Sequence, residues 1–169
     1  MGVNMKKLLI IFIFLFSYTS YGQTAEEYYN SALEKHQNGN YEDAIADYTK
    51  SIELEPRYIN YYNRGNVKFD LEDHSGAISD YTKAIELNPN KAGAYYTRGN
   101  AKNILDDHKG SIDDYTKAIE INPNNAVAYM GRGIAKYYLK DNNGACSDWR
   151  IAVNLGDEEA KEWIASQCN

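Results

Sequence analysis

One stretch of seven residues recurs along the chain, as DYTKSIE at 47–53, as DYTKAIE at 80–86 and 114–120, and as a weaker copy, DWRIAVN, at 148–154. An Arg-Gly pair recurs as well, and its glycines, Gly65, Gly99 and Gly133, are 34 residues apart. A fixed period of this length is typical of arrays in which each repeat is one supersecondary unit. The sequence therefore predicts four copies of one unit.

The spacing of apolar residues within each unit is helical. Tyr48, Ser51, Ile52 and Glu55 follow the i, i+3, i+4, i+7 pattern of one helix face. Each unit carries two such segments, separated by a polar or glycine-containing turn, and a proline closes each of the first three units. Small residues recur in both segments beside a column of Tyr48, Tyr81, Tyr115 and Trp149, which predicts closely packed helix pairs.

The period, the small columns, the aromatic column and the closing proline together resemble the tetratricopeptide repeat family. The resemblance covers four units, at 25–57, 58–91, 92–125 and 126–156, and implies one all-α domain over 23–169, a right-handed α-solenoid of helix-turn-helix repeats. Two departures stand out. Lysines replace the usual tyrosine at Lys35, Lys68, Lys102 and Lys136, and the fourth unit has Gly156 and Asp157 in place of proline. Residues 157–167 are expected to form a capping helix, because a stack of helix pairs needs an end piece over its last open face.

Residues 1–22 differ from the rest of the chain. Lys6 and Lys7 precede an unbroken apolar run at 8–16, and small and polar residues follow up to Gly22. This order is typical of a secretory signal peptide, and the apolar run is too short to span a bilayer. The alternative, a buried helix of the fold, would need a polar face that the run lacks. We therefore expect cleavage near Gly22, no transmembrane helix in the mature chain, and a periplasmic or secreted protein.

The composition excludes several classes of function. The 169 residues include 18 basic and 24 acidic side chains, for a net charge of −6, which disfavours nucleic-acid binding. Two Cys and three His are too few for a Cys-based zinc module, and no nucleophile-elbow, zinc-protease or phosphate-loop motif occurs. We expect no enzymatic activity, no metal and no cofactor.

The two cysteines are expected to form a disulfide. Cys146 lies ten residues before Gly156, where the chain should reverse, and Cys168 lies twelve residues after it, which places both at a similar height. Export would supply an oxidising compartment. The alternative is two unpaired cysteines, one of them buried and the other at a frayed terminus.

Two columns of opposite charge repeat with the period of the units. They are the pairs Arg64/Lys68, Arg98/Lys102 and Arg132/Lys136 on first helices, and Asp47, Asp80, Asp114 and Asp148 on second helices. Because opposite charges recur together, ion pairs between helices are favoured over an anion-binding stripe. The first unit has Ser31 in place of the arginine, so Asp47 is expected to face Arg64 or solvent.

First helices line a concave groove in the family that the chain resembles. Here they carry aromatic, apolar and amide side chains, namely Tyr29, Leu33, His36, Tyr62, Asn66, Phe69, Tyr96, Asn100, Asn103, Met130, Ile134 and Tyr137. Rings supply contact area and amides pair with main-chain groups, so the pattern suits an extended peptide. The alternative is that some of these residues only pack between units.

The groove does not match the family members that clamp an acidic C-terminus. Those members use Lys and Asn at fixed groove positions, where this chain has Tyr29 and Leu33, or Tyr62 and Asn66, and Gly93 and Val127 replace a later Lys. Two classes of function remain: an exported scaffold that binds a protein segment without catalysis, and a carbohydrate or cell-wall binding module that stacks sugars on the tyrosines.

Overall fold

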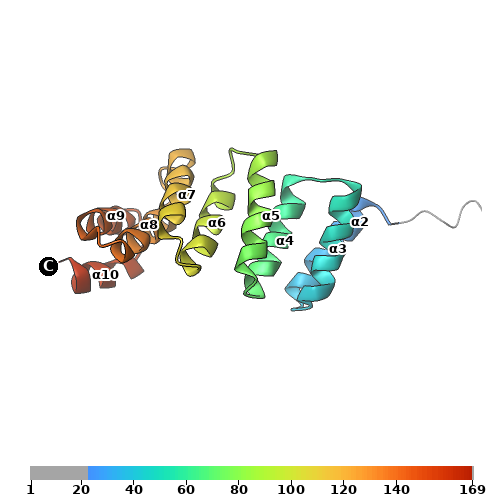
Figure 1. Ribbon diagram of the computed structural model, residues 1–169, viewed down its shortest axis with the longest axis horizontal. Coiled ribbons are helices and arrows are strands. Elements are labelled where there is room, and N and C mark those ends of the chain that lie inside the picture. Colours follow the sequence, from blue (N-terminus) through green and yellow to red (C-terminus); the bar gives the residue numbers. More distant parts are fainter. Residues whose placement is uncertain (1–22, 169) are drawn as a thin grey trace, which may run out of the picture.

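The computed structural model describes residues 23–168, and every regular element in that range is a helix (Figure 1). The expected signal peptide at 1–22 lies outside the described residues. The helices are α2 (Ala25–Gln37), α3 (Tyr41–Leu54), α4 (Tyr58–Asp70), α5 (His74–Leu87), α6 (Ala92–Ile104), α7 (His108–Ile121), α8 (Ala126–Tyr138), α9 (Asn142–Asn154) and α10 (Glu159–Gln167).

The helices stack in chain order along the long axis of the molecule, from α2 at one end to α10 at the other (Figure 1). Each helix packs on the next one, and first helices of neighbouring pairs also touch, α2 with α4 and α6 with α8. These contacts place the first helices side by side along one flank. The predicted all-α, right-handed solenoid of helix-turn-helix units is confirmed.

Glycines let the two helices of a pair approach closely. A Cβ atom on Gly65 would lie 2.7 Å from the ring of Tyr81, and one on Gly133 would lie 2.4 Å from the indole nitrogen of Trp149. Gly99 stands in the same relation to Tyr115. These rings are at most 1% exposed, so they form the centre of each unit.

The turns between the two helices of units two, three and four share one local structure. The residue at the corner of each turn, Glu72, Asp106 or Lys140, takes a positive φ of 61–66°, and the aspartate that follows accepts a hydrogen bond from the backbone N–H of a glycine three residues on. Such an N-cap satisfies a free amide at the start of the second helix. The first unit instead uses Gly39, with φ 76°.

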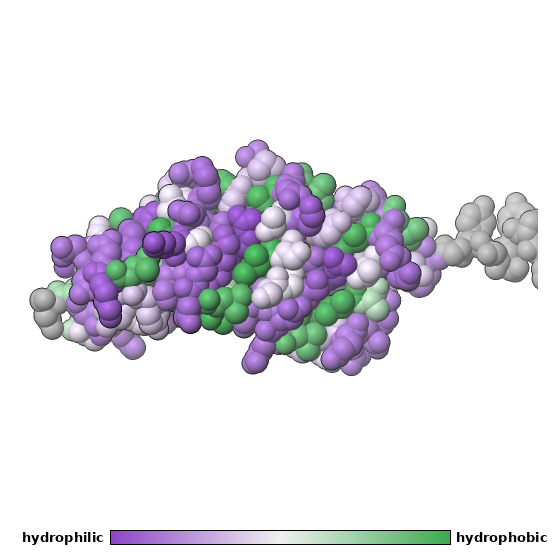
Figure 2. Space-filling view, in the orientation of Figure 1, coloured by the Kyte–Doolittle hydropathy of each residue, from purple (hydrophilic) through white to green (hydrophobic). Residues whose placement is uncertain are grey.

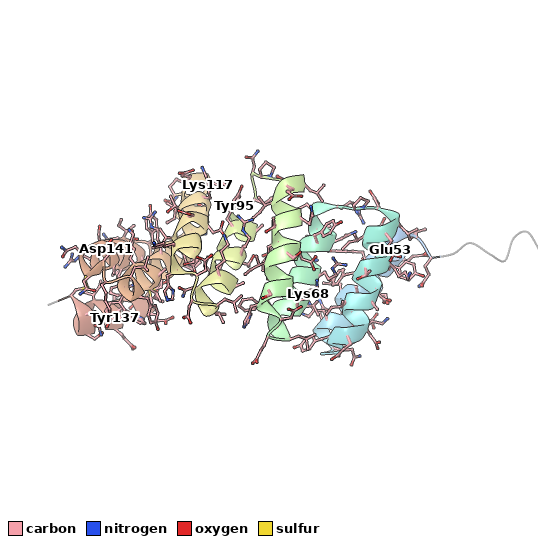
Figure 3. The ribbon with its side chains drawn as sticks, viewed as in Figure 1. Glu53, Lys68, Tyr95, Lys117, Tyr137 and Asp141 are labelled. Atoms are coloured by element: carbon pink, nitrogen blue, oxygen red, sulfur yellow. A yellow bond between two sulfur atoms is a disulfide. The ribbon has the colours of Figure 1, made fainter. Side chains whose placement is uncertain are left out.

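Ion pairs join the helices of units two to four in one repeated pattern. Arg98 donates two hydrogen bonds to Asp114, at 2.9 Å and 2.6 Å, and a third at 3.0 Å to Thr82 of the preceding unit. Lys102 adds a second ion pair to the same carboxylate, whose side chain is 4% exposed. Equivalent sets join Arg64 and Lys68 to Asp80, and Arg132 and Lys136 to Asp148 (Lys68 is labelled in Figure 3).

The expectation that Asp47 faces Arg64 or solvent is wrong. Asp47 accepts hydrogen bonds from Lys35 and from Ser31, both on the helix that precedes it, while Arg64 is held by Asp80 and Thr49. Burial alone would raise the pKa of Asp47, but the bonds from Lys35 and Ser31 outweigh it and hold the pKa below its ordinary value. The serine hydroxyl therefore takes part of the place that arginine fills in later units.

Helix α10 closes the last pair. Ala160 is fully buried, Trp163 and Ile164 pack on the core of α8 and α9, and a disulfide joins Cys146 of α9 to Cys168, with an S–S distance of 2.06 Å. In Figure 1, α10 lies at the end of the stack opposite α2.

Candidate functional site

The first helices border a cleft of about 330 Å³ at the C-terminal half of the stack. Its lining comes from α4, α6, α7, α8 and the start of α10, and comprises Phe69, Tyr96, Asn100, Asn103, Ile104, Tyr115, Val127, Met130, Gly131, Ile134, Asp157 and Glu159. We call it the large cleft. A first helix repeats its groove-facing position in each unit, which is why residues 34 positions apart, such as Tyr96 and Met130, meet here.

A second, smaller cleft of about 120 Å³ adjoins the first. It is lined by Asn66, Phe69, Asp70, Tyr81, Thr97 and Asn100, and we call it the small cleft. Phe69 and Asn100 line both clefts, so the two clefts adjoin, and we refer to them together as the groove.

Hydrogen bonds from buried tyrosines orient the groove asparagines. The Tyr115 hydroxyl donates to Oδ1 of Asn100 at 2.7 Å, and the Tyr81 hydroxyl donates to Oδ1 of Asn66 at 2.9 Å. Burial raises the pKa of both tyrosines well above the ordinary value, so both hydroxyls keep their protons at neutral pH. Because each Oδ1 already accepts from a tyrosine, the amide N–H groups of Asn66 and Asn100 remain as donors for a ligand.

Six of the expected groove residues come together in the large cleft: Phe69, Tyr96, Asn100, Asn103, Met130 and Ile134. Asn66 lines the small cleft. Met130 is only 6% exposed, so only a small part of its side chain faces the large cleft.

Tyr29, Leu33, Tyr62 and Tyr137 line neither cleft. Tyr29 packs edge-on against Tyr48, and its hydroxyl accepts a hydrogen bond from Asn63. Tyr137 is labelled beside α10 in Figure 3. The centroid of its ring lies 6.1 Å from that of Trp149 and 5.9 Å from that of Trp163. Tyr29 and Tyr137 thus take part in contacts within their own unit and with the next element, which is the packing alternative that the sequence left open.

Two tyrosine rings of the first helices, of which only Tyr96 lines a cleft, pack against other rings of the same protein. Tyr96 is tilted by 47° against Tyr115, and Tyr62 is tilted by 47° against Tyr81. Tyr62 is also stacked on Tyr58, with ring centroids 5.6 Å apart. Part of each ring is therefore covered by another ring of the same protein.

Several lining residues were missed by sequence reasoning. Ile104 and Val127 are about half exposed, at 51% and 47%, and neither was predicted to bind a ligand, although Val127 was noted where clamp-type family members carry a Lys. Ile104 stands one position beyond Asn103, and Val127 stands three before Met130.

Asp157 and Glu159 were not among the residues predicted to line the groove. Asp157 caps helix α10, by accepting from the N–H of Ala160 at 3.2 Å. The sequence holds no signal that the turn also reaches the groove.

The chemistry that the groove offers is apolar contact, amide donors and carboxylates. No group of three or more His, Cys, Asp or Glu side chains in the described part of the chain is arranged to hold a metal ion. Among residues 23–168, no helix has the length and apolar character needed to cross a membrane.

The family model that matches the chain is described as Tetratricopeptide repeat, and it matches three times, over residues 25–58, 60–91 and 92–125. Together these matches cover more than half of the chain. Residues 126–156 lie outside the matches, although α8 and α9 pack as the earlier pairs do. No curated protein matches the chain significantly.

Solved structures of the same architecture resemble the chain. A crystal structure of MamA is 27% identical, with a TM-score of 0.76, and the match covers 81% of each chain. The first repeat domain of Spaghetti (RPAP3), bound to the HSP90 peptide SRMEEVD, is 28% identical, with a TM-score of 0.67, over 70% of this chain and 94% of that one. The corresponding domain of OM64 from Arabidopsis is 28% identical, with a TM-score of 0.61, over 64% of this chain and 93% of that one.

Proposed function

Since the chain belongs to the tetratricopeptide repeat family, we propose that it is a non-catalytic scaffold that binds an extended segment of another protein along α4, α6 and α8. The observation that carries this proposal is the groove formed by the two adjoining clefts, in which Asn66 and Asn100 keep their amide donors free beside apolar walls. Main-chain carbonyl groups of an extended segment are the acceptors that such donors fit. The solved relative bound to the peptide SRMEEVD supports the same mode of use.

The proposal includes export. The order of charged, apolar and small residues at 1–22 supports a cleaved signal peptide, and the disulfide between Cys146 and Cys168 suits an oxidising compartment. The mature scaffold would comprise residues 23–169, with four repeats and the capping helix, and would act in the periplasm or outside the cell.

The test uses a random dodecapeptide display library selected on the mature protein, followed by titration calorimetry of the enriched peptide. Replacing two half-exposed cleft residues, as Ile104→Ser with Val127→Ser, removes apolar contact without emptying the core. We expect this double variant to bind the selected peptide about thirtyfold more weakly, because burial of each of the two side chains contributes on the order of 1 kcal/mol.

A matched control makes the same chemical change away from the groove. Leu54 and Leu87 are 57% and 49% exposed, at the ends of the outer helices α3 and α5, and line neither cleft. Leu54→Ser with Leu87→Ser should leave the affinity unchanged. Equal losses in both double variants, or a protein that selects glycans from an array and no peptide from the library, would reject the proposal in favour of a different surface or of the carbohydrate module.

A further inference from the structure

The two clefts of the groove are lined by carboxylates and by no cation. Asp70 borders the small cleft, and Asp157 and Glu159 border the large one. Within residues 23–168, no Lys or Arg belongs to the lining of either cleft. The charge that an incoming segment meets in the groove is therefore negative.

Cations on the first helices are already neutralised. The side chains of Arg98 and Lys102 both end on Asp114, whose side chain is 4% exposed, and the units on either side repeat this arrangement. Removing one of these cations would leave the buried carboxylate with one partner fewer, which is costly. They are consequently not available to bind an acidic ligand.

Two of the three carboxylates that line the clefts lie at the α10 end of the groove. Asp70, in the small cleft, is hydrogen-bonded to His36, with Nε2 and Oδ2 2.7 Å apart. Neither Asp157 nor Glu159 forms an ion pair with a Lys or Arg within the described residues, whereas their neighbour Glu158 is paired with Lys161. The negative charge of the large cleft therefore has no cationic partner in the described part of the chain.

The apolar wall beside these carboxylates suits the stem of a long cationic side chain. Val127, Met130 and Ile134 line the same cleft as Asp157 and Glu159, and Tyr96 adds an aromatic ring. Lys and Arg bury their methylene stems along apolar surface while the charged head stays in a polar setting. A ring nearby favours a cation further.

We propose that the groove selects a protein segment that carries a Lys or Arg side chain, with its main chain on Asn66 and Asn100 and its cation between Asp157 and Glu159. This inference rests on the function proposed above and adds the charge of the partner. For comparison, the peptide bound by the solved relative, SRMEEVD, carries one arginine and three carboxylate side chains.

The experiment is a double-mutant cycle between the protein and the peptide selected from the dodecapeptide library. On the protein, Asp157→Asn with Glu159→Gln removes both charges, and the asparagine retains the oxygen that caps α10. On the peptide, acetylation of the enriched lysine, or an Arg→Gln change, removes the charge and retains much of the stem. We expect the peptide change to weaken binding to the unmodified protein about fivefold and to the double variant less than twofold.

Glu158→Gln with Glu162→Gln is the matched control, because it removes two charges from the same end of the chain without touching the lining of either cleft. It should leave the fivefold effect intact. Enrichment of acidic or neutral peptides, or an equal acetylation effect in both double variants, would overturn the inference while leaving the groove as a peptide site. Absence of any selected peptide would overturn the proposed function, and this inference with it.

Discussion

Each arginine of units two to four links three helices through a single side chain. Arg98 holds Asp114 of its own unit with two hydrogen bonds and Thr82 of the preceding unit with a third, and its guanidinium lies 5.7 Å from the centroid of the Tyr95 ring. The planar fork of arginine permits this geometry, which lysine could not reproduce. The charge column therefore fixes the position of one unit on the next.

Arg98→Ala should lower the free energy of unfolding by about 3 kcal/mol, because it leaves the buried Asp114 with one partner fewer. Urea denaturation followed by circular dichroism measures the change. Lys117→Ala, which removes an exposed partner of Glu120, is the control and should leave the urea midpoint unmoved. Similar midpoints for the two variants would show that the arginine column is not structural.

Tyr48 gives the stability a dependence on alkaline pH. Burial raises the pKa of this fully buried tyrosine to about 12, against about 10 in the unfolded chain. The contribution of Tyr48 to the free energy of unfolding is present below about pH 10. It is lost between about pH 10 and pH 12, where the hydroxyl ionises only in the unfolded chain. Over that pH interval, the free energy of unfolding of Tyr48→Phe should therefore fall by about 2 kcal/mol less than that of the unmodified protein. Urea titrations at a series of fixed pH values measure this difference. Parallel losses in the two proteins would contradict the assignment.

Sequence reasoning could predict most, but not all, of the ion pairs between the helices. The pairing of Arg64, Arg98 and Arg132 with aspartates could be predicted, because both columns repeat with one period. The partner of Asp47 could not be predicted, because Ser31 breaks the column and only the packing of α2 on α3 shows that Lys35 reaches the carboxylate.

At the scale of the elements, the small columns decide how closely the helices pack. Gly133 lies against the indole of Trp149, where an added Cβ would meet the ring nitrogen at 2.4 Å. Gly93 is also helical, yet its nearest neighbour would be the Tyr62 hydroxyl at 3.6 Å, an ordinary contact. The effect of a Gly→Ala substitution can therefore be compared at a crowded position, Gly133, and at an open one, Gly93.

Gly133→Ala should destabilise the protein by about 2 kcal/mol, because the buried tryptophan ring must move. Gly93→Ala should raise stability by about 0.5 kcal/mol, because alanine is the better helix former. Thermal unfolding of the two variants measures both changes. A gain in stability at Gly133 would mean that the two helices do not pack as closely as described.

Helix α10 depends on the disulfide for part of its stability. The bond between Cys146 and Cys168 closes a loop with a sequence separation of 22, which corresponds to about 3 kcal/mol in the loop-entropy model. In Cys146→Ser with Cys168→Ser, amide hydrogen exchange in α10 should accelerate first, while α4 to α7 keep their protection. Uniform acceleration along the chain, or none, would contradict a local role for the bond.

The helix pairs and the pairing of the cysteines follow from spacing along the chain. The helical period places Cys146 in a column that faces the next unit, and for the last unit the next element is α10. What spacing did not show is that the turn before α10 brings Asp157 to the groove, because a helix-capping role already accounts for that carboxylate.

At the scale of the whole molecule, stacking converts a repeated sequence into one continuous flank. The face drawn in Figure 2 is largely hydrophilic, and hydrophobic residues occur on it as separate patches. The clefts of about 330 Å³ and 120 Å³ lie along the first helices, where neighbouring units meet. Most residues that line these clefts lie on the first helices α4, α6 and α8, whereas no residue of α2 lines either cleft. Sequence reasoning included tyrosines such as Tyr137 that pack between units, because a helical period alone does not separate a groove position from a contact between repeats.

The most direct measurement is the mapping of amide chemical shifts on the mature protein as the selected peptide is added. We expect the side-chain amide signals of Asn66 and Asn100 to shift, together with backbone signals of α4, α6 and α8, while α5 and α7 change little at their outer faces. Shifts confined to the outer helices, with both asparagine signals unmoved, would contradict binding in the groove.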